Sequence, residues 1–155
     1  MRKPTLTLGA VPERVVHWTA LLGLKVEAAF EPSGDEALFP NRVLVQGEDA
    51  SWLAASRGAA LDALQFLMHE AQGQREDAQL AYLDPLGTRL FRMKELKAMA
   101  AFAAEKAKEL GQFTLSGLTP RERRWIHLTI SKEPGLSSES EGLGHIKTLK
   151  VFRSA

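Results

Sequence analysis

The residues best suited to chemistry lie close together near the end of the chain, between Thr119 and Ile130. Arg123 and His127 are four residues apart, so on a helix they lie about 40° apart around the axis, one turn above the other. An arginine offers a rigid fork of donors that suits a phosphate, and its plane stacks on a base. A histidine donates to a phosphate oxygen or stacks on a base, and it gains charge on protonation. This pair therefore indicates contact with a polyanion such as a nucleic acid.

The same segment carries a specific signal for the start of a helix. Thr119 can cap the first turn, Pro120 is tolerated there, and Glu122 completes a Thr-x-x-Glu capping box. On the helix that follows, Arg121 and Arg124 lie on the face that adjoins the Arg and His pair. They widen the positive field that a phosphate backbone would meet.

Two other interpretations of these residues stay open. An Arg and a His four residues apart on a helix are more often not ligand contacts. Either both are ordinary exposed ions, or the histidine lies at the edge of the core. Ile126 and Ile130 do lie beside His127, which fits the second case. Trp125 offers a stacking surface for a base. Its position two residues from Arg123 turns it to another side of the helix, however, which favours packing in the core.

The net charge of +1 conceals a difference between the two parts of the chain. Residues 1–90 hold 8 Lys and Arg against 12 Asp and Glu, which gives −4, whereas residues 91–155 hold 12 against 7, which gives +5. Such an asymmetry suggests that the basic part meets a polyanion. Lys147, Lys150 and Arg153 near the end of the chain extend this positive track as second-rank contacts. An ordinary solvated surface is the alternative.

Composition and missing motifs exclude several classes of function. The chain has 155 residues, 45% of them hydrophobic and 25% charged, and its apolar stretches are far shorter than the about 20 residues of a membrane helix. It has no cysteine, and its four histidines (His17, His69, His127 and His145) lack metal-binding spacing. No Walker loop, dinucleotide fingerprint or nucleophile elbow occurs. We therefore expect a non-catalytic cytoplasmic protein without a metal or cofactor.

Hydrophobic periodicity predicts the secondary structure of the first part of the chain. The predicted helices are 12–23, 51–55 and 59–71, and the predicted strands are 25–30, 42–46 and 79–83. Their order is helix, strand, strand, helix, helix, strand. This order, together with the sequence from Leu53 to Gln65, resembles a KH domain of the bacterial type II topology (αββααβ), and the resemblance assigns residues 10–86 to it.

In the KH family a GxxG loop joins two helices and holds the backbone of about four nucleotides. Ser56, Arg57 and Gly58 complete this loop here, but Ala55 takes the place of its first glycine. A methyl group there crowds a phosphate or opposes a positive φ. With the acidic charge of this part of the chain, the departure implies a weaker RNA contact and favours a scaffold or a docking surface.

The second part of the chain resembles another family. Beside the capped helix, periodicity predicts a helix at 93–110 and strands at 113–115, 136–141 and 145–152, the last two joined at Gly142-Leu143-Gly144. The string Thr-Pro-Arg-Glu-Arg-Arg-Trp-Ile-His-Leu, followed by Ser-Glu-Ser-Glu-Gly-x-Gly, resembles the R-three-H domain over residues 92–153. That domain is named for the residues that Arg123 and His127 supply here, and it is associated with sequence-tolerant binding of single-stranded nucleic acid. Ser140 matches a serine of the family's Ser-Glu-Gly segment, for which turn formation is favoured.

A KH domain followed directly by an R-three-H domain resembles the Jag family, the SpoIIIJ-associated bacterial RNA-binding proteins. Members often carry an extra N-terminal Jag domain, for which this chain has no room. The expected fold is α+β, with a small three-stranded sheet in the R-three-H domain. The resemblance implies a regulator or chaperone that binds single-stranded RNA, with single-stranded DNA left open. The alternative is an interaction module whose KH part docks another small KH-domain protein.

Overall fold

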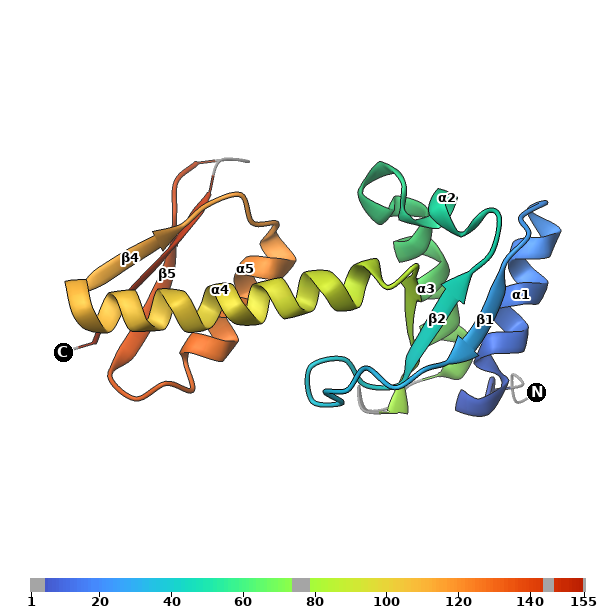
Figure 1. Ribbon diagram of the computed structural model, residues 1–155, viewed down its shortest axis with the longest axis horizontal. Coiled ribbons are helices and arrows are strands. Elements are labelled where there is room, and N and C mark those ends of the chain that lie inside the picture. Colours follow the sequence, from blue (N-terminus) through green and yellow to red (C-terminus); the bar gives the residue numbers. More distant parts are fainter. Residues whose placement is uncertain (1–4, 74–78, 144–146, 155) are drawn as a thin grey trace. The chain divides into compact units, whose positions relative to one another are not determined.

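The computed structural model describes residues 5–73, 79–143 and 147–154, which fall into two compact units (Figure 1). The first unit is Met1–Met93 and the second is Lys94–Ala155. Over the described residues, each unit combines helices with one three-stranded sheet. The α+β class expected from the sequence is therefore confirmed.

The first unit has the order helix, strand, strand, helix, helix, strand that the sequence predicts. Its elements are α1 (Val11–Leu21), β1 (Glu27–Phe30), β2 (Arg42–Gln46), α2 (Ala50–Ala54), α3 (Ala59–Gln72) and β3 (Tyr82–Pro85), with 3-10 turns at Leu8–Ala10 and Ser56–Gly58. The order alone does not decide the family, and the KH assignment stays a prediction.

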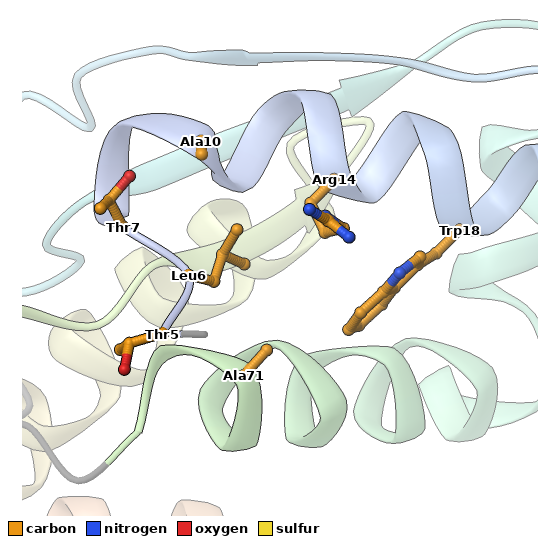
Figure 2. A pocket seen from close by; sticks show the side chains of 7 residues that line it. All are labelled: Thr5, Leu6, Thr7, Ala10, Arg14, Trp18 and Ala71. Carbon is orange, nitrogen blue, oxygen red and sulfur yellow. The ribbon is translucent and has the colours of Figure 1, made fainter. Parts of the chain in front are cut away.

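β2 is the central strand of the first sheet, whose order is β1-β2-β3. β1 is antiparallel to it and β3 is parallel to it. Val43 pairs with Leu83, and Val45 lies two residues further on, so these side chains share one face of the sheet. That face is covered by α1 and α3, which lie side by side (Figure 2). Together with α2, these helices contribute Val11, Val15, Leu53, Leu61, Leu64 and Met68 to the core.

Side chains of α3 close the outer edge of β3. Gln65 donates to the Ala81 carbonyl oxygen at 2.7 Å and accepts from the Leu83 amide at 2.7 Å. Gln72 accepts from the Ala81 amide at 3.1 Å. These bonds satisfy backbone groups that would otherwise be unpaired at a sheet edge. β3 begins at Tyr82, later than predicted.

A buried ion pair lies on the opposite face of the first sheet. Nε of Arg42 donates to Oδ2 of Asp84 at 2.7 Å, and the two side chains are 7% and 0% exposed. Oδ1 of Asp84 accepts from the Arg89 amide at 2.8 Å, in the first turn of α4 (Thr88–Leu110). Because α4 gains this acceptor for one of its free amides, it begins before the predicted Met93.

Removal of this carboxylate is expected to destabilise the first unit strongly. Asp84→Ala leaves the Arg42 guanidinium buried without its closest partner, which costs about 3–5 kcal/mol of unfolding free energy. Urea unfolding, followed by tryptophan fluorescence and circular dichroism, measures the loss. Glu48→Ala is the control, because the Lys25–Glu48 pair is exposed and such pairs contribute at most about 1 kcal/mol. Equal stability of the two variants would contradict the prediction.

The second unit contains most of α4 and the second sheet. Its further elements are β4 (Gln112–Leu115), α5 (Pro120–Ile130), β5 (Leu136–Glu141) and β6 (Thr148–Arg153). The predicted helices and strands are therefore found in the predicted order. The last strand begins at Thr148 rather than at residue 145. Residues 144–146, which cover the end of the predicted connection and the start of the predicted strand, lie outside the described residues.

β6 is the central strand of the second sheet, whose order is β4-β6-β5 with antiparallel neighbours. Leu149 and Val151 of β6 are buried, so this side of the sheet faces the core. Phe102 of α4 packs on Phe113 of β4, with the ring centroids 5.4 Å apart. Ile126 of α5 is fully buried as well. Both helices thus cover the same side, α4 towards β4 and α5 towards β5.

Candidate nucleic-acid interface

The start of α5 is fixed by a capping box, as the sequence predicts. Oγ1 of Thr119 accepts from the Glu122 amide at 3.3 Å, and Oε2 of Glu122 accepts from the Thr119 amide at 2.7 Å. Pro120 occupies the first turn, where an amide would lack a helical partner. From this start each residue of α5 is rotated by about 100° relative to the one before.

The spacing of Arg123 and His127 predicts that both lie on one open face, but Arg123 does not lie there. Its side chain is 8% exposed, and its Nη1 donates to the Leu118 carbonyl oxygen at 2.8 Å. It shares the inward side of α5 with Ile126 and Ile130. Among the described residues no buried side-chain nitrogen lacks a partner, so the other guanidinium nitrogens reach the surface. Arg123 is therefore first an anchor for the loop before α5, with a narrow edge open to a phosphate.

His127 is exposed and lies where α5 packs on β5. Its Nδ1 is 2.7 Å from Oγ of Ser138. In the ladder Ser138 pairs with Val151, so it lies on the side of the sheet that α5 covers. Sequence reasoning missed this serine, although the alternation of the predicted strand already separates it from the residues on either side of it.

The outward side of α5 is basic. Arg121, Arg124 and Leu128 are exposed, Leu128 by 50%. Because they follow one another at three and four residues, they form one stripe along the helix. Trp125 follows Arg121 by four residues and so adjoins this stripe, but it is partly buried, in accord with a packing role. His127 borders the stripe, three residues after Arg124.

Alternation along β5 places two of its serines and both of its carboxylates on opposite sides of the sheet. Ser138 and Ser140 lie on the side that α5 covers, whereas Glu139 and Glu141 lie on the other side. Nζ of Lys150 is 3.2 Å from Glu141 and 3.9 Å from Glu139. An anion that approaches beside α5 therefore meets serine hydroxyls on this strand rather than its carboxylates.

The basic residues of the last strand are not all brought to α5. Lys150 points to the side of the sheet away from α5, where the two glutamates neutralise it. Lys147 is exposed just before β6, and Arg153 is exposed at its end. Ser140, whose segment was expected to form a turn, lies inside β5. The turn begins at Gly142, where φ is 109°.

A long helix followed by β4, α5, β5 and β6, with an arginine and a histidine one turn apart on α5, has a counterpart among known domains. Residues 94–153 match the R-three-H domain. The match contains α5 and the whole second sheet, and it supports a nucleic-acid-binding protein that contains an R-three-H domain. This domain suggests single-stranded nucleic acid as the class of ligand. No curated protein matches the chain.

The loop between α2 and α3 lies outside the R-three-H domain. Ala55 is extended, with φ −68° and ψ 166°, so no positive φ is required where it replaces a glycine. The positive φ values fall instead on Ser56 (52°) and Gly58 (78°). The conflict between Ala55 and a positive φ was therefore wrongly predicted. The side chain of Arg57 lies outside the described residues.

A hollow of about 350 Å³ lies between α1 and the end of α3 in the first unit (Figure 2). Trp18 and Arg14 project from α1 towards it, and Ala71 lies opposite on α3. Leu6 borders it, and the Leu6 amide donates to the Ala71 carbonyl oxygen at 2.8 Å. No motif of the sequence points to this hollow, and the residues that line it lie outside the R-three-H domain.

Two further features are absent from the part of the chain that the structure describes. There, no group of three or more His, Asp or Glu side chains gathers closely enough to hold a metal ion. None of the helices described combines the length and the apolar character needed to cross a membrane.

Loss of the helix cap is expected to loosen the R-three-H domain. Thr119→Ala removes the acceptor for the Glu122 amide and costs about 1 kcal/mol, which lowers the melting temperature of a domain of this size by about 4–8 °C. Thermal unfolding followed by circular dichroism measures the shift. Ser116→Ala, at an exposed position in the same loop, is the control and should melt like the wild type. If both variants melt alike, the capping box does not anchor α5.

Proposed function

We propose that this protein binds single-stranded RNA without catalysis and that α5 of the R-three-H domain makes the main contact. One arrangement carries the proposal. Arg121, Arg124 and His127 are exposed along α5, and the carboxylates of the adjoining strand are turned to the other side of the sheet. A phosphate backbone therefore meets donors on the helix and hydroxyls on the side of β5 next to it.

The chemistry of this surface suits a backbone rather than a base sequence. The guanidinium of Arg124 is a planar fork of five donors that fits a phosphate. Leu128, half-exposed and one turn further on, offers an apolar contact for the face of any base. Neither group distinguishes one base from another, so tolerance of sequence is expected. Single-stranded DNA presents the same phosphates and is a second ligand of this proposal.

The first unit is proposed as a supplementary contact. Its order of elements resembles a type II KH domain, and the loop of Ser56, Arg57 and Gly58 leads into the N-terminus of α3, where free amides can approach a phosphate. The acidic balance of residues 1–90, 8 basic against 12 acidic side chains, weakens that contact. Because a KH domain beside an R-three-H domain resembles the Jag family, we propose a cytoplasmic bacterial RNA-binding regulator or chaperone.

One observation favours a second function, in which the first unit docks another small KH-domain protein. Phe66 and Leu67 of α3 are 62% and 51% exposed, and adjoining apolar side chains on a helix surface are typical of interfaces. Phe66→Glu is then expected to abolish the complex, as measured by size-exclusion chromatography with light scattering, and to leave RNA affinity unchanged. Failure of the wild-type chain to form such a complex rejects this alternative.

RNA affinity is expected to fall steeply with salt. If α5 neutralises about two to three phosphates, the logarithm of the association constant falls with the logarithm of the salt concentration with a slope of about −1.4 to −2.1. A rise in salt from about 50 to 200 mM then weakens binding roughly 7- to 18-fold. Fluorescence anisotropy of a labelled oligouridine measures the affinity, with DNA and duplex oligonucleotides for comparison. Arg124→Ala should lower the affinity and make the slope shallower by about 0.7.

Lys150→Ala is the matched control, because it removes a cation from the side of the sheet away from α5, where two glutamates already neutralise it. Its affinity should stay close to that of the wild type. Arg57→Ala should weaken binding less than Arg123→Ala, once a melting curve shows that both variants are folded. Lost affinity in Arg57→Ala, with affinity retained in Arg123→Ala and Arg124→Ala, overturns the assignment to α5. Undetectable RNA binding at low salt overturns the function.

A further inference from the structure

A side-chain hydrogen bond joins β5 to the exposed histidine of α5, with Oγ of Ser138 2.7 Å from Nδ1 of His127. We infer that Ser138 is a positioning residue, which holds the imidazole so that Nε2–H faces a phosphate oxygen of the bound nucleic acid. The inference rests on the proposed function, because it names the atom of the same site that meets the ligand.

A hydroxyl suits this position because it both donates and accepts. We assign the direction of this bond in the neutral ring as donation from the serine hydroxyl to bare Nδ1, which leaves the ring hydrogen on Nε2. When the ring is protonated, Nδ1–H donates to Oγ, and Nε2 still carries its hydrogen. Without the serine, a neutral ring also populates the tautomer in which Nε2 has no hydrogen. Phosphate oxygens are acceptors, so that tautomer loses the contact.

The backbone of β5 holds the hydroxyl beside the ring. Ser138 pairs with the fully buried Val151, on the side of the sheet that α5 covers. Because a serine side chain is short and this one is already partly buried, the bond orders few additional degrees of freedom. Nδ1 is engaged and the ring is exposed, so Nε2 is the nitrogen available to a ligand.

The charges near the ring do not take over this role. α5 contributes Arg123, which donates to a backbone carbonyl, and Arg124, which is exposed. The glutamates of β5 and Lys150 of β6 lie on the other side of the sheet. A neutral hydroxyl therefore sets the ring hydrogen without drawing negative charge to a surface that binds phosphate. A carboxylate in the same place would repel the ligand.

The position of the ring hydrogen can be measured without RNA. In the full chain, long-range proton–nitrogen NMR spectra at about pH 8, above the usual titration range of an imidazole, report which nitrogen of His127 carries the hydrogen. The wild type is expected to show hydrogen on Nε2 alone, and Ser138→Ala a mixture of both tautomers. Ser138→Thr retains the hydroxyl and should restore the wild-type pattern. Ser137→Ala, on the opposite side of the same strand, is the control.

The same variants are then titrated with labelled oligouridine of about twelve nucleotides at low salt. Ser138→Ala is expected to weaken binding about three- to tenfold, as for one lost hydrogen bond, whereas Ser138→Thr and Ser137→Ala bind like the wild type. Ser138→Val has the shape of Ser138→Thr but no hydroxyl. If Ser138→Ala disturbs the fold, Ser138→Val is compared with Ser138→Thr in its place.

The outcomes separate the two hypotheses. If the wild type binds RNA and a variant without the Ser138 hydroxyl keeps either the wild-type tautomer or the wild-type affinity, the inference is overturned and the proposed function stands. If the wild type binds no RNA, the proposed function fails, and the inference fails with it whatever the tautomer of the ring.

Discussion

The residue at which α5 begins decides which of its side chains can meet a ligand. Each residue turns by about 100° from the one before, so a shift of one residue would bring a different side chain to β5 in place of His127. Two interactions oppose such a shift. The capping box of Thr119 and Glu122 supplies the first turn with acceptors, and the Arg123 guanidinium holds the carbonyl just before the helix. The contact between His127 and β5 depends on both.

This anchoring gives the arginine of the motif a role inside the domain. Burial of a charged group is costly unless it keeps its hydrogen bonds. At 8% exposure, Arg123 keeps them by donating to the Leu118 carbonyl and by leaving the rest of its fork at the surface. A lysine lacks the planar guanidinium, so it could not donate to the Leu118 carbonyl and also present further donors at the surface. Substitution of Arg123 is therefore expected to change stability as well as the proposed ligand contact, so variants of Arg124 and His127 test that contact more directly.

Local signals in the sequence predicted the order of the helices and strands and the capping box, because each depends on neighbours in the chain. The starts of β3 and α4 were misplaced; at α4 the Asp84 carboxylate accepts from an amide of the first turn, an acceptor that hydrophobic periodicity does not reveal. The burial of Arg123 was missed, although its spacing of three and seven residues from Ile126 and Ile130 already places it on their side of the helix. The partner of His127 and the neutralisation of Lys150 were missed for a different reason. Both depend on which strands and helices pack together, and neighbouring residues in the sequence do not determine that packing.

In the proposed function, attraction for RNA has to come from charge placed over short distances rather than from the net charge, which is +1 for the whole chain. Physiological salt screens exposed charges beyond about 8 Å. Within that range, the stripe on α5 gathers cations, and the alternation of β5 turns its carboxylates to the other side of the sheet. A surface that neutralises few phosphates depends strongly on each donor. On the inferred role of Ser138, the orientation of a single imidazole, set by a hydroxyl on the neighbouring strand, is then expected to have a measurable share in binding.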